Sequence, residues 1–188
     1  MKILDTLFGR TKAAPADLDR LFALPGAAVN LDVALGLGFA NRAGVCVKPA
    51  GNEPFEEALN EAIELAKLDH LDNRIVDDRY GYRWAIFSGA GLEDLVTAVH
   101  GVNSTLADRA LGNQLLCSAF AFTSPKRTLP VLLVYLYKRG TFYPFAPVGG
   151  EKRDTETELS IRAAVGVDLP VEAELERWFP LWDNPLMS

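Results

Sequence analysis

The feature that most constrains the fold is a set of short strand-like runs joined in pairs by tight polar turns. These runs occupy residues 44–49, 74–78, 82–88, 115–123, 129–137 and 141–146. Strands linked by tight turns pair antiparallel, whereas parallel strands need a crossover of a dozen or more residues. The sequence therefore predicts a hairpin over residues 74–88 and a three-stranded meander over residues 115–146, both in an antiparallel sheet.

Helical patterns separate these strand runs. Apolar residues recur every three or four positions in residues 53–67 and 92–106, and an acidic helix is predicted from Asp154 or Thr155 to about Val165. Shorter helices are expected at residues 17–24 and 171–178. Residues 27–35 alternate apolar and polar positions in a way that suits a half-buried strand or an irregular helix equally well.

Hairpins interleaved with helices predict an α+β fold rather than a doubly wound parallel sheet. We expect one domain over residues 13–188, with about five to seven strands and helices mainly on one face. The element order over residues 53–166 is similar to the fold of type III secretion chaperones. At the C-terminus, residues 177–182 contain two tryptophans and a phenylalanine, which predicts an aromatic strap docked on the domain, with an exposed interaction motif as the alternative.

Composition and the length of the apolar runs indicate where in the cell the protein resides. The chain has 188 residues and a net charge of −6, and Asp5, Arg10 and Lys12 interrupt what would be a signal sequence. The longest apolar run, residues 129–137, is far shorter than a membrane-spanning helix. We therefore expect a cytoplasmic protein. Its two cysteines lie in separate strand-like runs without metal-binding spacing, so buried free thiols are predicted.

Motifs for enzyme chemistry are incomplete. The glycines at residues 36–41 lack the third glycine of a phosphate-binding loop, and Ser88 has no glycine two positions before it. The only histidines, His70 and His100, lie 30 positions apart. We therefore expect no enzyme activity, no metal and no cofactor.

One polar patch can still be tested as a site. Thr97, His100 and Ser104 have spacings that place them on adjacent turns of one helix. A base in a His100 pocket is the enzyme alternative, and a half-exposed helix shoulder is the structural alternative.

Charge is distributed unevenly. No acidic residue occurs in residues 109–150, which carry five basic residues and seven aromatic residues, whereas residues 53–78 carry a net charge of −7. The candidate partner-binding residues are Lys126, Arg127, Lys138, Arg139, Phe142 and Tyr143. Because the acidic segment would repel a polyanion, nucleic acid is not the expected partner, and an acidic helical protein partner is the hypothesis. A nucleic-acid module built on residues 109–150 stays the alternative, and a sheet core with solvated turns stays the structural explanation.

The first 12 residues form a separate short amphipathic segment. Ile3, Leu4, Leu7 and Phe8 recur at helical spacing, with three basic residues nearby. They are candidates for weak, reversible membrane contact, since four apolar residues cannot anchor a protein stably. Packing on the domain or on a partner is the alternative.

Several segments are jointly distinctive. They are residues 4–12, 18–25, 93–106, 137–147 and 177–182. Together they resemble the bacterial PspA-associated family called PspAB, over nearly the whole chain. The resemblance implies a cytosolic accessory protein of a phage-shock type of envelope-stress response, with a PspA-like coiled-coil protein as the suspected partner. It supplies no catalytic residues. The sequence therefore favours a non-enzymatic adaptor or regulatory binding protein, located in the cytoplasm or peripherally at the inner face of the membrane.

Overall fold

The computed structural model describes residues 17–67 and 70–187, and its centre is a six-stranded sheet. The strands are β1 (Gly38–Val47), β2 (Asp72–Asp77), β3 (Arg83–Ser88), β4 (Leu115–Thr123), β5 (Val131–Leu136) and β6 (Thr141–Phe145). Their order is β2-β3-β1-β4-β5-β6, and every neighbouring pair is antiparallel. A small hairpin of β7 (Pro147–Gly149) and β8 (Lys152–Arg153) follows. The predicted α+β class, hairpin and meander are confirmed.

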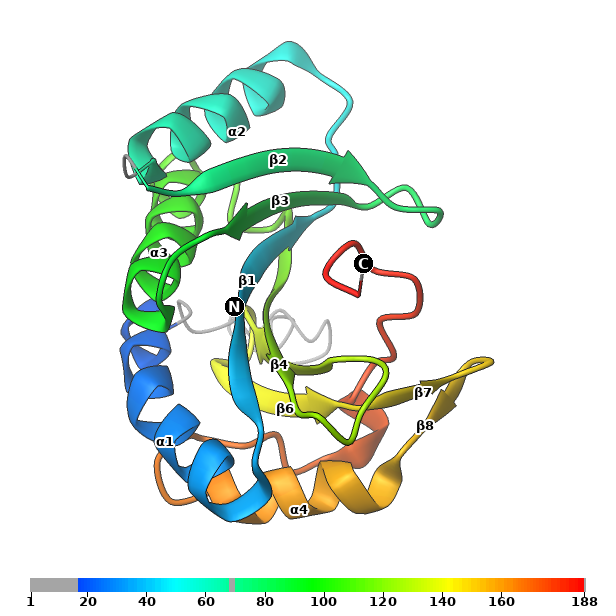
Figure 1. The fold of residues 1–188 in the computed structure, drawn as a ribbon. Coiled ribbons are helices and arrows are strands. Elements are labelled where there is room, and N and C mark those ends of the chain that lie inside the picture. The colour runs from blue at the N-terminus through cyan, green and yellow to red at the C-terminus, as the bar shows by residue number, and fades with distance from the viewer. Residues whose placement is uncertain (1–16, 68–69, 188) are drawn as a thin grey trace, which may run out of the picture.

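Helices cover one face of this sheet (Figure 1). They are α1 (Leu24–Leu35), α2 (Glu53–Ala66), α3 (Leu92–Asp108) and α4 (Thr155–Val165), and a 3-10 turn, η1 (Leu18–Ala23), leads directly into α1. Caps explain where several of these helices begin and end. Asn52 accepts a hydrogen bond from Phe55 N, Asp154 accepts one from Thr157 N, and Gly36 ends α1 in the left-handed conformation.

Alternation along the strands produces two apolar layers, because successive strand side chains point to opposite faces. On β1, Val45 and Val47 pack toward the helices, whereas Cys46 packs on the other side. On β3, Phe87 faces the helices and Trp84 faces away from them. The sheet therefore has a second apolar face that the helices cannot cover.

The C-terminal segment covers part of this second face, between the β2–β3 and β7–β8 hairpins (Figure 1). Trp178 and Leu186 are buried against it, with Leu181, Trp182 and Met187 packed around them. We call residues 171–187 the C-terminal strap. The helix predicted at residues 171–178 is wrong, since only the 3-10 turn η2 (Leu175–Arg177) forms there.

The strap begins extended because it pairs with the sheet edge. Phe142 N donates to Pro170 O at 2.8 Å, and Glu172 N donates to Phe142 O at 2.7 Å. These bonds continue the sheet beyond β6 in a short parallel bridge at Val171, and they hold the start of the strap extended instead of helical.

The structure decides one segment that the sequence left open and moves one predicted boundary. Residues 27–35, which suited a strand or a helix, lie in α1. Strand β1 begins at Gly38 rather than at residue 44, since a register shift between Phe39 and Ala43, where Asn41 has φ 52°, interrupts its alternation. Within the described part of the chain, no helix has the length and apolar character needed to cross a bilayer.

Candidate functional site

A cavity of about 500 Å³ lies between the second face of the sheet and the C-terminal strap. Strands contribute Cys46, Trp84, Leu116, Cys117, Leu136 and Tyr143 to its wall. Turns contribute Asp78, Tyr80, Tyr82, Lys138 and Arg139, and the strap contributes Arg177, Phe179, Pro180, Leu181, Trp182 and Asn184. Small-molecule pockets in proteins span roughly 300–1,000 Å³ and are mostly apolar, which is the character of this cavity.

The two cysteines face each other in the wall of this cavity. Cys46 and Cys117 are directly paired across β1 and β4, and both are buried free thiols, as the sequence predicts. The hydrogen bond between the Cys46 thiol and the Cys117 side chain, together with burial, raises the pKa of Cys46 well above its usual value. In residues 17–67 and 70–187 there is no cluster of three or more His, Cys, Asp or Glu that could hold a metal ion.

The Asp78 carboxylate, the acidic group in the cavity wall, already accepts hydrogen bonds from its neighbours. Asp78 accepts hydrogen bonds from Trp84 Nε1 at 3.0 Å, Tyr80 N at 2.9 Å and Tyr82 N at 3.0 Å. Such bonds hold the β2–β3 turn and fix the Trp84 ring in the wall. The Tyr143 hydroxyl likewise donates to Phe179 O at 2.8 Å, which ties the strap to β6.

The structure separates the basic residues that the sequence grouped together. Lys126 and Arg127 lie in the β4–β5 turn, and Lys138 and Arg139 lie in the β5–β6 turn, at the opposite end of β5. Only Lys138 and Arg139 line the cavity. One continuous basic patch is therefore not formed, because successive turns of a meander alternate between its two ends.

Both arginines of these turns have structural partners. Arg127 donates to Asp154 Oδ2 and to Pro147 O, each at 2.9 Å, and thereby joins the β4–β5 turn to the start of α4. Arg139 forms an ion pair with the buried carboxylate of Glu172 and a longer one with Glu174. The charge of Lys126 and Lys138, by contrast, is exposed to solvent and has no described ion-pair partner.

Two aromatic candidates are not on the surface. Phe142 is 0% exposed and packs beneath the helices, and Tyr143 is 1% exposed in the cavity wall. Six of the seven aromatic residues of the meander are buried, since strand aromatics here fill the two apolar layers. The expectation that Phe142 and Tyr143 offer an exposed contact surface is therefore corrected.

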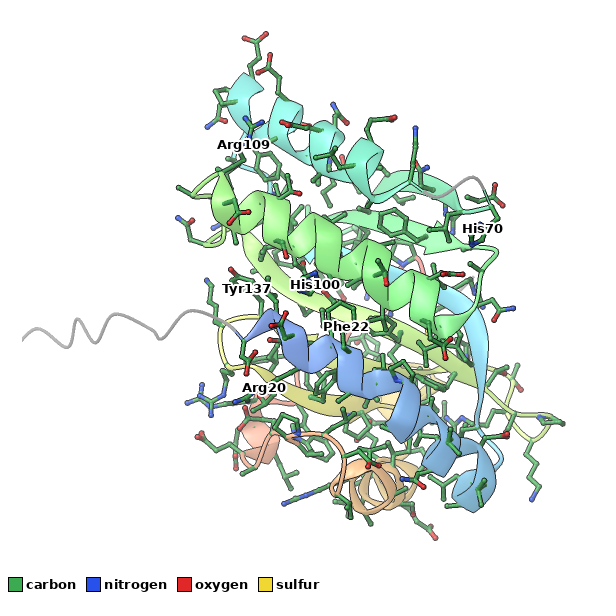
Figure 2. All side chains as sticks on the ribbon, turned by 90° about the vertical axis from the view of Figure 1, so that its left-hand side faces the viewer. Arg20, Phe22, His70, His100, Arg109 and Tyr137 are labelled. Carbon is green, nitrogen blue, oxygen red and sulfur yellow. The ribbon has the colours of Figure 1, made fainter. Side chains whose placement is uncertain are left out.

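The polar patch on α3 lies on the helix side of the sheet, away from the cavity. His100 Nε2 is 3.2 Å from Asp19 Oδ1, its Nδ1 is 3.4 Å from Ser104 Oγ, and its ring lies 4.8 Å from that of Phe22 (Figure 2). Thr97 donates instead to Glu93 O, one turn back on its own helix. His100 is thus engaged by the η1 turn and does not line the cavity under the strap.

A surface that the sequence prediction missed lies on the outer side of η1 and α1, the blue elements in Figure 2. Phe22, Gly26, Val29 and Val33 are all exposed and follow one another at spacings of four, three and four residues. We call these four residues the α1 stripe. Val29 is 61% exposed and Val33 is 82% exposed. The opposite side of the helix buries Leu24, Ala27 and Leu31, so α1 is apolar on both sides.

The membrane-contact candidates Ile3, Leu4, Leu7 and Phe8 lie outside the described residues. Their predicted contact with lipid is therefore not tested by the structure.

A family model matches nearly the whole chain. The model of the PspAB family, described as PspA associated protein B, matches residues 1–186. No curated protein and no solved structure matches the chain, and the likeness to type III secretion chaperones is accordingly not confirmed.

Proposed function

We propose that this chain, which belongs to the PspAB family, is a non-enzymatic adaptor of a PspA-type envelope-stress response. In this proposal it binds one helix of a PspA-like coiled-coil protein along the α1 stripe. The family description supports association with a PspA system, and the apolar outer side of α1 is the observation that carries the choice of surface.

A helix that is apolar on all sides is normally buried on all sides, whereas a surface helix has a polar outer face. In α1 only Asn30 and Asp32 are polar, and Asn30 is held by a 2.6 Å hydrogen bond to Asp168 after α4. The outer valines have no described cover. Large exposed apolar patches of this kind mark interaction sites.

The pattern of the α1 stripe suits a helix as the partner. Spacings of four, three and four residues are those of the apolar seam in a coiled coil, where each side chain inserts between residues of the facing helix. From Phe22 to Val33 the stripe covers about three helical turns. Asp19 and Asp32 flank it and are exposed, so the partner helix is expected to carry basic residues beside its apolar seam.

Titration of the purified protein with the PspA homologue of the same organism tests the proposal. The double variant Val29→Lys and Val33→Lys should weaken binding about 10- to 100-fold, because each buried valine contributes roughly 1.5 kcal/mol and each 1.4 kcal/mol is tenfold. Lysine is a good helix former, so α1 should persist in the variant.

Val148→Lys is the matched control, because Val148 is 56% exposed on β7 and lies outside the α1 stripe. It should bind the PspA homologue like the parent protein. Unchanged affinity of the double variant would refute the proposal. The proposal would also be refuted if ultracentrifugation showed a homodimer for the parent protein and a monomer for the double variant, since the stripe would then bind a second copy of the chain.

We also propose weak peripheral membrane contact of this cytoplasmic protein through Ile3, Leu4, Leu7 and Phe8. Co-sedimentation with anionic vesicles should be reduced for a chain that begins at Ala13. Equal sedimentation of both chains would remove the membrane role from residues 1–12.

A further inference from the structure

We infer that the cavity beneath the C-terminal strap is a binding site for a small amphipathic anion, a molecule with an apolar chain and one anionic head group. Lys138 would contact the head group, and the aromatic walls would enclose the chain. This site lies on the face of the sheet opposite the helices, so it is separate from the α1 stripe and independent of the proposed protein partner.

The walls determine the body of the ligand. Trp84, Leu136 and Tyr143 of the sheet face Phe179 and Trp182 of the strap across the cavity. A molecule held between these side chains must be mostly apolar, since polar atoms would lose their water without gaining partners.

The polar groups that remain free determine its head group. Acceptors in the wall are used, since Asp78 receives three hydrogen bonds and the Asn184 side-chain oxygen accepts from Leu186 N at 3.0 Å. In the part of the chain that the structure describes, the wall groups without a partner are Lys138 Nζ, the Tyr82 hydroxyl and Trp182 Nε1. All three can donate a hydrogen bond, and none is acceptor-only.

Charge at the rim agrees with this choice. Arg139 is balanced by Glu172, and Arg177 is balanced by Glu174 at 2.7 Å. Among the residues that the structure describes, Lys138 is thus the cation of this rim that no carboxylate neutralises. An anionic head group would complete the set at Lys138, whereas Asp78, the acid of this wall, keeps its charge but already accepts three hydrogen bonds from neutral donors.

Tryptophan emission provides a direct assay, because the chain has three tryptophans. Trp84 and Trp182 line the cavity, and Trp178 packs in the same apolar layer. Decanoate should change the emission of the full-length protein in a saturable way. Butanoate should bind at least about a hundredfold more weakly, since each buried methylene contributes roughly a fourfold gain in affinity. Decanol and decyltrimethylammonium test the need for the anionic head group and should bind more weakly than decanoate.

Lys138→Met is the decisive variant. It should weaken decanoate binding about three- to fivefold, the size of one exposed ionic contact, and leave decanol binding unchanged. Lys126→Met is the matched control, because Lys126 is an exposed lysine of the turn at the other end of β5 and does not line the cavity. It should bind decanoate like the parent protein.

Vesicles of phosphatidylglycerol provide a second arm, since a membrane lipid presents the same chemistry as a free acid. Binding of decanoate that depends on Lys138 but occurs without vesicle binding assigns a free amphipathic acid. Vesicle binding that depends on Lys138 assigns a lipid. Absence of saturable binding in both arms, or equal binding by Lys138→Met, would overturn the inference and leave the α1 proposal unaffected.

Discussion

Glu172 should be the residue that holds the C-terminal strap on the sheet, and Glu172→Ala is the variant that tests this. Its side chain is 1% exposed and forms an ion pair with Arg139. It also accepts hydrogen bonds from Thr141 Oγ1 at 2.9 Å and from Glu174 N at 3.1 Å. The carboxylate thus joins the β5–β6 turn, β6 and the strap at one point.

The cost of removing this carboxylate follows from the donors it leaves behind. Bonds to a charged group contribute about 1.5–3 kcal/mol each when their partners are buried. Arg139 is 37% exposed, so water replaces part of its contact with Glu172. We expect a total loss of about 2–3 kcal/mol in the free energy of unfolding. This corresponds to a Tm lower by about 4–12 °C for a chain of this length.

Urea unfolding followed by tryptophan emission measures this loss, and Glu174→Ala is the matched control. Glu174 pairs with Arg139 at 3.5 Å and with Arg177 at 2.7 Å, but its side chain is 53% exposed. Its removal should cost at most about 1 kcal/mol. Equal stability of the two variants would show that the buried carboxylate does not hold the strap, and the reasoning would be refuted.

Three further outcomes are expected. Stability should fall as the pH drops below about 4.5 toward more acidic values. Burial alone would raise the pKa of Glu172, but hydrogen bonds hold the folded-state pKa of both Glu172 and Asp154 below their usual values of 4.5 and 3.8. The stability that these carboxylates contribute above those pH values is therefore lost when they are protonated. Measurement of the urea midpoint at decreasing pH checks this, and a constant midpoint would contradict it. Asp154→Ala should lower the free energy of unfolding by about 1–2 kcal/mol in urea unfolding, since the α4 cap to Thr157 and the contact with Arg127 are both lost, and an unchanged value would argue against a stabilising role of this carboxylate. Cys46 and Cys117 should react with a maleimide far more slowly in the native protein than in urea, because both thiols are buried and the pKa of Cys46 is raised; equal rates would show that the cavity exposes them.

Local patterns were sufficient for most of the fold. Apolar residues at helical spacing in α2 and α3, and tight polar turns between β4, β5 and β6, depend on interactions within a few residues of one another. Such interactions can be recognised in one sequence without knowledge of distant contacts. The antiparallel sheet, its helical cover and the buried cysteines were accordingly predictable.

The α1 helix and the strap were not predictable in this way. A segment that is apolar on both sides has no helical or strand periodicity, so residues 27–35 suited either structure until their packing beside α4 was known. Residues 171–178 resembled a helix locally, but pairing with Phe142 on β6 kept their start extended. Contacts between distant segments override local propensity in such cases.

The candidate sites depend even more on tertiary structure. By charge alone the four basic turn residues form one group, but the meander places Lys126 and Lys138 at opposite ends of β5. By residue type Phe142 and Tyr143 are candidate partner contacts, but the sheet buries both. Composition determines which charged and apolar groups a chain possesses. Burial and the pairing of strands determine which of these groups lie next to one another, and only groups that lie next to one another can form a binding site.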